Sequence, residues 1–148
     1  MNETSPESKP LDISAIEHVA IAVPDLENAI EFYKSRFGAN VGDPVDIPSQ
    51  SIRIACVEFA NAKIELMQPL EENSAVGKFL ARNPAGGLHH ICFATGDADR
   101  AYADADSLEL RPLGPPSKGY HGRPLFFLHP KAAMGTLIEI EEAAEEQL

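Results

Sequence analysis

The sequence predicts an α+β fold built from two tandem βαβββ modules. A histidine in the middle of an apolar, strand-like segment occurs at His18 and again at His90. A glutamate in a second strand-like segment also recurs, and the spacing from Glu65 to Glu139 nearly equals that of the two histidines. Between the two copies lies a turn-forming run at residues 84–87, after which the pattern restarts. A period of about seventy residues exceeds that of solenoid repeats and fits one duplicated module.

The first module begins with a strand. Apolar and β-branched residues alternate over residues 16–23, which is typical of a half-buried strand. Asp25 then follows Pro24 and can cap a helix whose apolar residues share one face, and Gly38 can end that helix. The module is completed by a weak extended segment at 39–46 and a hairpin formed by 52–59 and 63–68.

The second module repeats this order after a short linker helix that Ser74 can cap. Its first strand is predicted over residues 88–95. Asp97 follows Asp25 at the same spacing at which His90 follows His18, and it can cap a second helix over 98–107. The remaining strands are predicted at 108–113, 124–128 and 136–142.

The domain organisation follows from these elements. We expect a single domain over residues 14–143, made of modules at about 14–70 and 86–143. The polar leader at residues 1–13 is expected to be disordered, and the acidic tail from residue 141 onward is expected to fray. A chain of 148 residues is long enough to bury a core of its own.

Composition excludes several classes of partner. The net charge of −11 disfavours nucleic acids and anionic membrane surfaces. The sequence has no apolar run of membrane-spanning length and no signal-peptide pattern at its start. Cys56 and Cys92 are widely spaced in apolar runs, so we interpret them as small buried residues of a reducing compartment. The expected location is the cytoplasm.

The two faces of the histidine strands differ in the size of their side chains. His18 shares its face with Ala20 and Ala22, whereas the opposite face carries bulky residues, and the strand of His90 repeats this pattern. We expect the bulky faces to pack under the helices. The small residues would leave a void in a core, so the histidine faces are expected to line a concave ligand site.

The four recurring polar side chains form a plausible ligand set for a divalent metal. Glu65 and Glu139 lie in the middle of apolar strands, where a carboxylate is costly to bury unless it is paired or bound to a metal. A single strand histidine is more often structural than a ligand, but recurrence at matching offsets favours coordination by His18 and His90. His89 has the parity of the bulky face, so His90 is preferred as the ligand.

Short motifs spread over residues 16–142 resemble those of a known family. They are Glu-His-Val-Ala-Ile-Ala-Val at 17–23, Lys-Ile-Glu-Leu at 63–66, Asn-Pro-Ala-Gly-Gly-Leu-His-His-Ile at 83–91, Gly-Tyr-His-Gly at 119–122, Phe-Leu-His-Pro-Lys at 127–131 and Leu-Ile-Glu at 137–139. With these motifs the chain resembles the vicinal oxygen chelate superfamily, the group of the glyoxalases and dihydroxybiphenyl dioxygenases. The His-His, His-Pro-Lys and Gly-x-His-Gly stretches together resemble its epimerase branch.

The resemblance implies a curved mixed sheet around one divalent metal, with His18, Glu65, His90 and Glu139 as its ligands. In some relatives glutamine takes the place of Glu65. Co²⁺ is the favoured ion, with Mn²⁺, Ni²⁺, Zn²⁺ or Fe²⁺ as alternatives. The implied substrate is an acyl-CoA thioester, and the implied assembly is a homodimer.

The implied reaction interconverts the (2R) and (2S) forms of methylmalonyl-CoA, and related enzymes accept ethylmalonyl-CoA. Removing and returning the C2 proton requires two acid–base groups on opposite sides of that carbon. We assign Glu139 as one base and Glu65 as the second. Some relatives carry a further glutamate on the strand that here covers residues 51–56, but this run contains no acid.

Four polar residues outside the ligand set are candidates for binding the substrate. Gln50 precedes the strand that lacks the extra acid, and His121 lies in a glycine-flanked loop that could close over a ligand. Lys118 and Lys131, together with Arg123, are the best basic cluster of the second module. The alternative interpretation is that the loop is a plain exposed hairpin and the basic residues are simply solvated.

Other functions share the predicted fold. A glyoxalase I-like lyase or another enzyme of the superfamily would use the same kind of metal site. A non-catalytic small-molecule binder is a further alternative, although such relatives commonly lack the metal ligands. An extradiol dioxygenase is disfavoured, because its pattern needs two histidines and one glutamate for iron within a typically longer chain.

Overall fold

The computed structural model describes residues 9–144, and these divide into two compact units. Residues 18–90 form one of them, here called the central unit. The described residues up to 17 and from 91 onward form the other, here called the terminal unit. Two strands, β1 (Ile13–Ala22) and β6 (Gly87–Thr95), contribute residues to both units.

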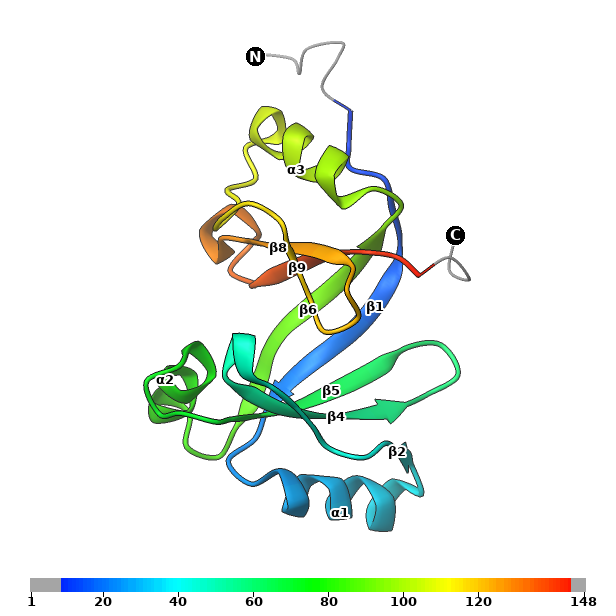
Figure 1. The fold of residues 1–148 in the computed structure, drawn as a ribbon, viewed down its shortest axis with the longest axis vertical. Helices are drawn as coiled ribbons and strands as arrows, with labels where there is room; N and C mark the ends of the chain where they lie inside the picture. Colours follow the sequence, from blue (N-terminus) through cyan, green and yellow to red (C-terminus); the bar gives the residue numbers. More distant parts are fainter. Residues whose placement is uncertain (1–8, 145–148) are drawn as a thin grey trace. The chain divides into compact units, whose positions relative to one another are not determined.

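The central unit is a mixed sheet with helices packed on it (Figure 1). Its strand order is β2-β4-β5-β1-β6, with β3 paired to β4. Strand β1 runs parallel to β5, whereas β4 runs antiparallel to its neighbours. The remaining elements are α1 (Leu26–Phe37), β2 (Asn40–Val41), β3 (Val45–Ile47), a 3-10 turn (Pro48–Gln50), β4 (Ile52–Glu58), β5 (Lys63–Pro69) and α2 (Ala75–Arg82).

The sheet of the central unit carries an apolar cluster on each of its faces. On one face Ala55, Val57 and Leu66 pack with Leu26 and the other apolar residues of α1. Ile21 of β1 packs in the same cluster, as expected for the bulky face of the His18 strand. The opposite face carries a second cluster that includes residues of β3 and α2. Its buried members are Ala20, Ala22, Ile47, Ile52, Ile54, Met67 and Val76.

This second cluster corrects one sequence-based expectation. Ala20 and Ala22 are both fully buried in the cluster, against which Phe79 of α2 packs, so they do not line an open ligand site. Their small side chains make room for the large residues of neighbouring elements. Periodicity within one strand shows which residues share a face, but it does not show what covers that face.

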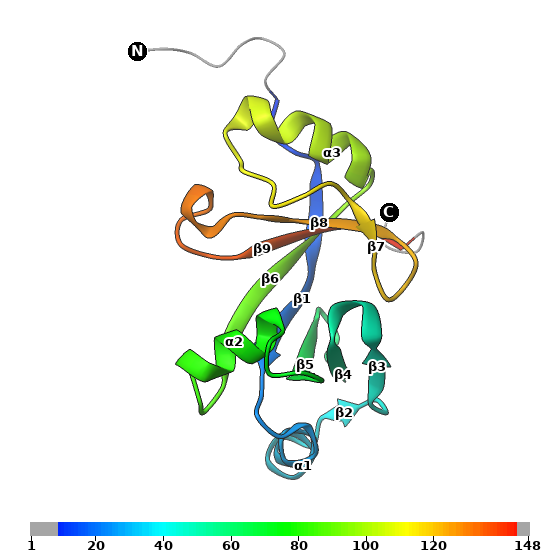
Figure 2. The same ribbon diagram turned by 60° about the vertical axis from the view of Figure 1, so that its left-hand side comes forward.

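The terminal unit is built on the same plan (Figure 2). Its strand order is β1-β6-β9-β8-β7, with β6 parallel to β9, β8 antiparallel to β9 and helix α3 packed on β8 and β9. Ala101 of α3 packs with Phe126, Leu128 and Ile140 on one face of this sheet. The elements are α3 (Ala98–Ala105), 3-10 turns (Asp106–Leu108 and Pro130–Ala132), β7 (Ser117–Lys118), β8 (Pro124–Leu128) and β9 (Ile138–Glu142).

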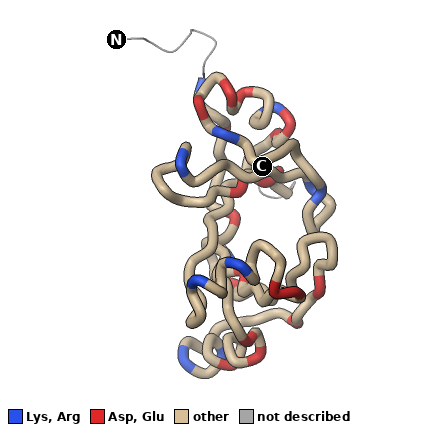
Figure 3. Tube along the Cα trace, turned by 90° about the vertical axis from the view of Figure 1, so that its left-hand side faces the viewer, with Lys and Arg blue, Asp and Glu red and all other residues tan. Residues whose placement is uncertain are grey.

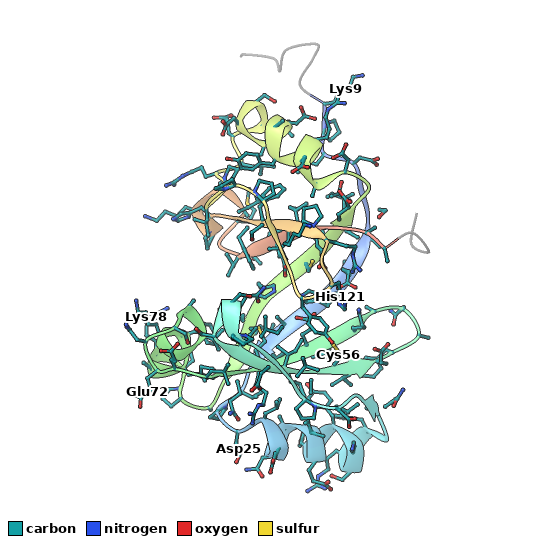
Figure 4. The ribbon with its side chains drawn as sticks, in the orientation of Figure 1. Lys9, Asp25, Cys56, Glu72, Lys78 and His121 are labelled. Carbon is teal, nitrogen blue, oxygen red and sulfur yellow. The ribbon has the colours of Figure 1, made fainter. Side chains whose placement is uncertain are left out.

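Both units cap their first helix with the same two devices. An aspartate one residue before the helix accepts a hydrogen bond from a backbone N–H of the first turn, and a residue from the end of the parallel partner strand accepts another. The aspartates are Asp25, labelled at the start of α1 in Figure 4, and Asp97, which accept from Asn28 N at 3.1 Å and Arg100 N at 3.0 Å. The strand residues are Gln68 and Glu142, which accept from Leu26 N at 2.7 Å and Ala98 N at 3.1 Å.

Charged residues also suit the ends of α1. Glu27 lies in its first turn, and Lys34 and Arg36 lie in its last turn, so both ends carry the sign of charge that complements the helix dipole. The acidic and basic residues of this helix are coloured in Figure 3. None of the described helices is long and apolar enough to cross a membrane.

Three element boundaries differ from the sequence-based expectation. Strand β1 begins at Ile13, the last residue of the expected leader, while residues 1–8 lie outside the described part of the chain. The expected strand at 108–113 is absent, and this region forms only a single bridge from Pro112 to Leu128. Proline has no N–H to donate to a strand ladder; Pro112 lies within the segment, and Pro115 and Pro116 follow it. Glu141 belongs to β9 and is buried instead of frayed; residues 145–148 lie outside the described residues.

Candidate metal centre

The central unit brings three of the four predicted ligands together. His18 on β1 and His90 on β6 are 2% and 6% exposed, and their Nε2 atoms lie 3.4 Å apart. Glu65 on β5 places its Oε1 3.4 Å from His18 Nε2. The two imidazoles meet edge to face with ring centroids 5.5 Å apart. The Nε2 atom of His18 is therefore within 3.4 Å of both His90 Nε2 and Glu65 Oε1.

The spacing of these atoms fits a bound cation. A metal bound at about 2.1 Å by two imidazole nitrogens holds those nitrogens about 3.0 to 3.4 Å apart. Two imidazoles and a carboxylate suit Zn²⁺, Co²⁺ and other divalent transition metals. The residues present therefore form a donor set that can hold a divalent metal.

The strand register explains why Glu65 reaches this point. Glu65 lies opposite Ala20 of β1 and opposite Cys56 of β4. Both neighbours are small, and the side chain of Glu65 remains 15% exposed beside the buried histidine. A carboxylate that keeps some contact with water loses less hydration than a fully buried one. The local sequence thus places the acid at the edge of the apolar cluster.

His89 has a role that strand parity did not predict. Its Nδ1 lies 2.9 Å from Nδ1 of His90, and its ring meets that of Phe79 at a centroid distance of 5.1 Å. A hydrogen bond at Nδ1 fixes the ring orientation of His90 and leaves Nε2 directed at His18. The His-His pair in the sequence was the available signal for this arrangement.

Glu139 lies in the terminal unit, in the middle of β9. It is 6% exposed, with Cys92 of β6 on one side and Phe127 of β8 on the other. The structure therefore confirms that Glu139 is a buried carboxylate on an apolar strand. Its membership of the ligand set stays a prediction.

The terminal unit also contains a group of buried residues that the sequence analysis missed. One ligand-type atom from each of Glu17, Cys92 and Glu141 lies within 4.8 Å of those of the other two. The Cys92 thiol is 3.9 Å from Glu141 Oε1, and all three residues are at most 3% exposed. Glu141 has the same strand parity as Glu139, and this was the signal that could have revealed it.

The four predicted substrate-binding residues are all exposed. In the central unit, Gln50 ends the 3-10 turn before β4. In the terminal unit, His121 lies in the loop between β7 and β8 (Figure 4). Lys118 pairs with the first residue of β8, whereas Lys131 follows its last residue. Lys118 therefore lies beside the start of β8 and Lys131 lies past its end, so the two lysines do not form the expected basic cluster.

Comparison with known proteins now defines the class. The family model of the Glyoxalase/Bleomycin resistance protein/Dioxygenase superfamily matches residues 17–127. The chain therefore belongs to this superfamily, which confirms the resemblance drawn from its motifs and the paired βαβββ plan.

Within the superfamily, the chain is similar to epimerases that act on acyl-CoA substrates. The ethylmalonyl-CoA/methylmalonyl-CoA epimerase of Cereibacter sphaeroides is 45% identical over 132 residues, covering 88% of this chain and 98% of that protein. The mitochondrial methylmalonyl-CoA epimerase of Homo sapiens is 41% identical over 145 residues, covering 92% of this chain and 82% of that protein.

Solved structures give the same result. A methylmalonyl-CoA epimerase in complex with methylmalonyl-CoA and NH4+ matches with a TM-score of 0.83 and 35% identity, covering 90% of this chain and 97% of that chain. The methylmalonyl-CoA epimerase of Mycobacterium tuberculosis matches with a TM-score of 0.84 and 31% identity, covering 93% of both chains.

Proposed function

We propose that this chain is an epimerase that interconverts the (2R) and (2S) forms of methylmalonyl-CoA, with ethylmalonyl-CoA as a second substrate. The observation that carries the proposal is the pair of contacts that His18 makes with His90 and Glu65, in a chain 45% identical to an ethylmalonyl-CoA/methylmalonyl-CoA epimerase. The match covers nearly the whole of that relative, so it extends over both modules.

The proposed cofactor is one divalent metal per chain, with Co²⁺ favoured over Mn²⁺, Ni²⁺, Zn²⁺ and Fe²⁺. His18, Glu65, His90 and Glu139 would hold it. When bound, such an ion acts as a Lewis acid that stabilises the negative charge developing on the thioester oxygen.

The chain itself must move the C2 proton. We assign the removal of this proton to the carboxylate of Glu139, which becomes a carboxylic acid. A different proton is delivered to the opposite face by the carboxylic acid of Glu65, which becomes a carboxylate, because inversion needs acid–base groups on both sides of the carbon. Glu139 is the more buried of the two, and exclusion of water strengthens electrostatic interactions in the site. Glu65 is partly exposed and can exchange its proton with solvent.

Several finer assignments belong to the same proposal. Gln50, Lys118, His121 and Lys131 are exposed polar residues that suit contacts with the polar parts of coenzyme A. A homodimer in the cytoplasm is the proposed state of the protein. A single domain over residues 14–143 also stays a prediction.

A coupled epimerase assay with a metal panel tests the function. The protein is stripped with a chelator and assayed on methylmalonyl-CoA after addition of each candidate ion, with ethylmalonyl-CoA assayed in parallel. Restored turnover is expected with Co²⁺, and His18→Ala is expected to bind no stoichiometric metal and to stay inactive. A protein that turns over the hemithioacetal of glutathione and neither acyl-CoA would be a glyoxalase I-like lyase, and one that turns over nothing with any ion would contradict catalysis.

A further inference from the structure

One lysine of the central unit lies beside His18 in the strand register. Lys63 begins β5 and is the register partner of His18 on β1. It precedes Glu65 by two positions, so the side chains of Lys63 and Glu65 leave the same face of the strand. Lys63 is half-buried, which is typical of a lysine whose aliphatic stem lies along apolar surface while its ammonium reaches a polar region.

No other lysine or arginine of the strands in the central unit shares the face of Lys63. Arg53 of β4 leaves the opposite face and pairs with Asp46. Within residues 18–90, Lys63 is therefore the one lysine or arginine on the ligand-bearing face of the strands. That face is made by His18, Ala20 and Ala22 of β1, Ile52, Ile54, Cys56 and Glu58 of β4, Lys63, Glu65 and Met67 of β5, and Leu88 and His90 of β6.

Lys63 also breaks the internal duplication. The offset that relates Glu65 to Glu139 relates Lys63 to Leu137, an apolar residue. The two histidines and two glutamates of the predicted site thus recur, whereas this cation occurs once. A feature present in one module only is suited to an asymmetric part of the substrate. In a malonyl thioester that part is the free carboxylate, because one side of C2 carries it and the other side carries the thioester.

We propose that the ammonium of Lys63 binds the free carboxylate of the malonyl group. This inference rests on the proposed function and extends it to the recognition of the substrate. A charge-assisted hydrogen bond from lysine to a carboxylate is stronger than a neutral one, and it discriminates against acyl-CoA molecules without the carboxylate. The proposal makes Lys63 a substrate-binding residue that sets specificity.

The competing explanation is a structural ion pair. Glu58 is the register partner of Lys63 across the β4–β5 hairpin and is exposed. An exposed ion pair contributes little to stability, so a purely structural role predicts small effects that are the same for every ligand. Glu58→Gln provides the matched control, because it removes the carboxylate that lies opposite Lys63 in the strand register and leaves Lys63 in place.

The test compares two inhibitors that differ in the carboxylate. Dissociation constants of malonyl-CoA and propionyl-CoA are measured by calorimetry for the metal-loaded wild type, Lys63→Gln, Lys63→Arg and Glu58→Gln, with metal content measured for each. Lys63→Gln is expected to weaken malonyl-CoA binding roughly 10- to 100-fold and to leave propionyl-CoA within about twofold. Lys63→Arg should recover part of the loss, and metal content should not change. Lys78→Gln, on the exposed side of α2 (Figure 4), serves as a second control.

The outcomes separate this inference from the proposed function. Equal weakening of both inhibitors, or no change in either, overturns the role of Lys63 while epimerase activity of the wild type upholds the proposed function. Loss of metal from Lys63→Gln would show that the residue supports the metal centre instead of the substrate. A wild type without epimerase activity and without affinity for either thioester overturns both.

Discussion

The ligand-bearing faces of the two units differ in what fills them. In the central unit, Met67 of β5 lies opposite Ile54 and is 3% exposed within an apolar cluster. The matching position of the terminal unit, at the offset that relates Glu65 to Glu139, is Glu141, which lies opposite Leu125 and is also 3% exposed. The same place in the same fold thus holds a thioether in one copy and a carboxylate in the other.

This difference shows which features a duplication preserves. The faces under α1 and α3 are apolar in both units, and the caps of both helices use the same types of contact. These features stabilise the module and are independent of any ligand. On the other face, α2 covers the apolar cluster of the central unit, while the terminal unit buries Glu17, Glu139 and Glu141. Because buried carboxylates cost stability, the terminal unit maintains them at the expense of core packing.

The largest effect is expected from the two matched glutamates of the proposed site. Glu139→Gln should slow exchange of the C2 proton of methylmalonyl-CoA with deuterated solvent by roughly 10²- to 10⁴-fold, because an amide cannot accept the proton. Glu65→Gln should lose less, since glutamine stands at this place in some members of the resembled family. Exchange is followed by mass spectrometry.

Circular dichroism and metal analysis of the same two variants provide the controls. Both should keep the fold, because glutamine matches glutamate in size. Exchange at the wild-type rate in Glu139→Gln would remove this residue from the role of base. A larger loss of exchange rate in Glu65→Gln than in Glu139→Gln would show that Glu65, and not Glu139, is the main base.

A stability measurement tests the difference between Met67 of the central unit and Glu141 at the matching position of the terminal unit. Met67→Glu places in the central unit the residue type that the terminal unit carries, and the carboxylate would enter the apolar cluster around Ile54. We expect the free energy of unfolding to fall by about 3 to 5 kcal/mol, as for an uncompensated buried charge. Urea unfolding measures the change. Met67→Leu conserves volume and should cost less than about 1.5 kcal/mol. Equal stability of both variants would mean that this face tolerates a carboxylate in either unit.

The sequence predicted features that depend on local pattern. Alternation along β1, β5 and β6 placed His18, Glu65 and His90 on faces that converge, and Asp25 and Asp97 marked the starts of the helices. Such features need only the period of the strand or the chemistry of a cap.

Features that depend on tertiary packing were not predictable in this way. Nothing within β1 indicates that α2 covers Ala20 and Ala22, because the helix that covers them lies much later in the chain, after β5. His89 was assigned by parity to the bulky face, although a hydrogen bond between neighbouring rings ties it to His90. Register and side-chain contacts between distant segments decide both cases.

A smaller and symmetric effect is expected at the two helix caps. Asp25→Ala and Asp97→Ala each remove a side-chain acceptor from the first turn of a helix. Each should lower the free energy of unfolding by about 0.5 to 2 kcal/mol, and by similar amounts if the two modules share one design. Thermal and urea unfolding provide the measurement, and Asp25→Asn and Asp97→Asn, which keep a capping oxygen, should recover most of the loss. A large inequality between the two positions would show that the duplicated caps do not contribute equally.

The smallest effect is expected in the pH dependence of the free energy of unfolding, through an ion pair that only the central unit contains among the two matched positions. The hydrogen bond from Arg53 lowers the pKa of the Asp46 carboxyl, and both side chains are exposed on β3 and β4. A carboxyl with a lowered pKa in the folded state contributes stability above its unfolded pKa of about 3.9, and this contribution disappears as the pH falls through the folded value. In the terminal unit, the residue of β8 that corresponds to Arg53 of β4 is Pro124, and proline has no charged group that could pair with a carboxylate. Asp46→Asn should therefore change the slope of unfolding free energy against pH below about pH 4 and leave the slope near neutral pH unaltered. Urea unfolding across the acidic range up to about pH 6 decides the point, because parallel curves for the wild type and Asp46→Asn would show that the pair adds nothing specific to the central unit.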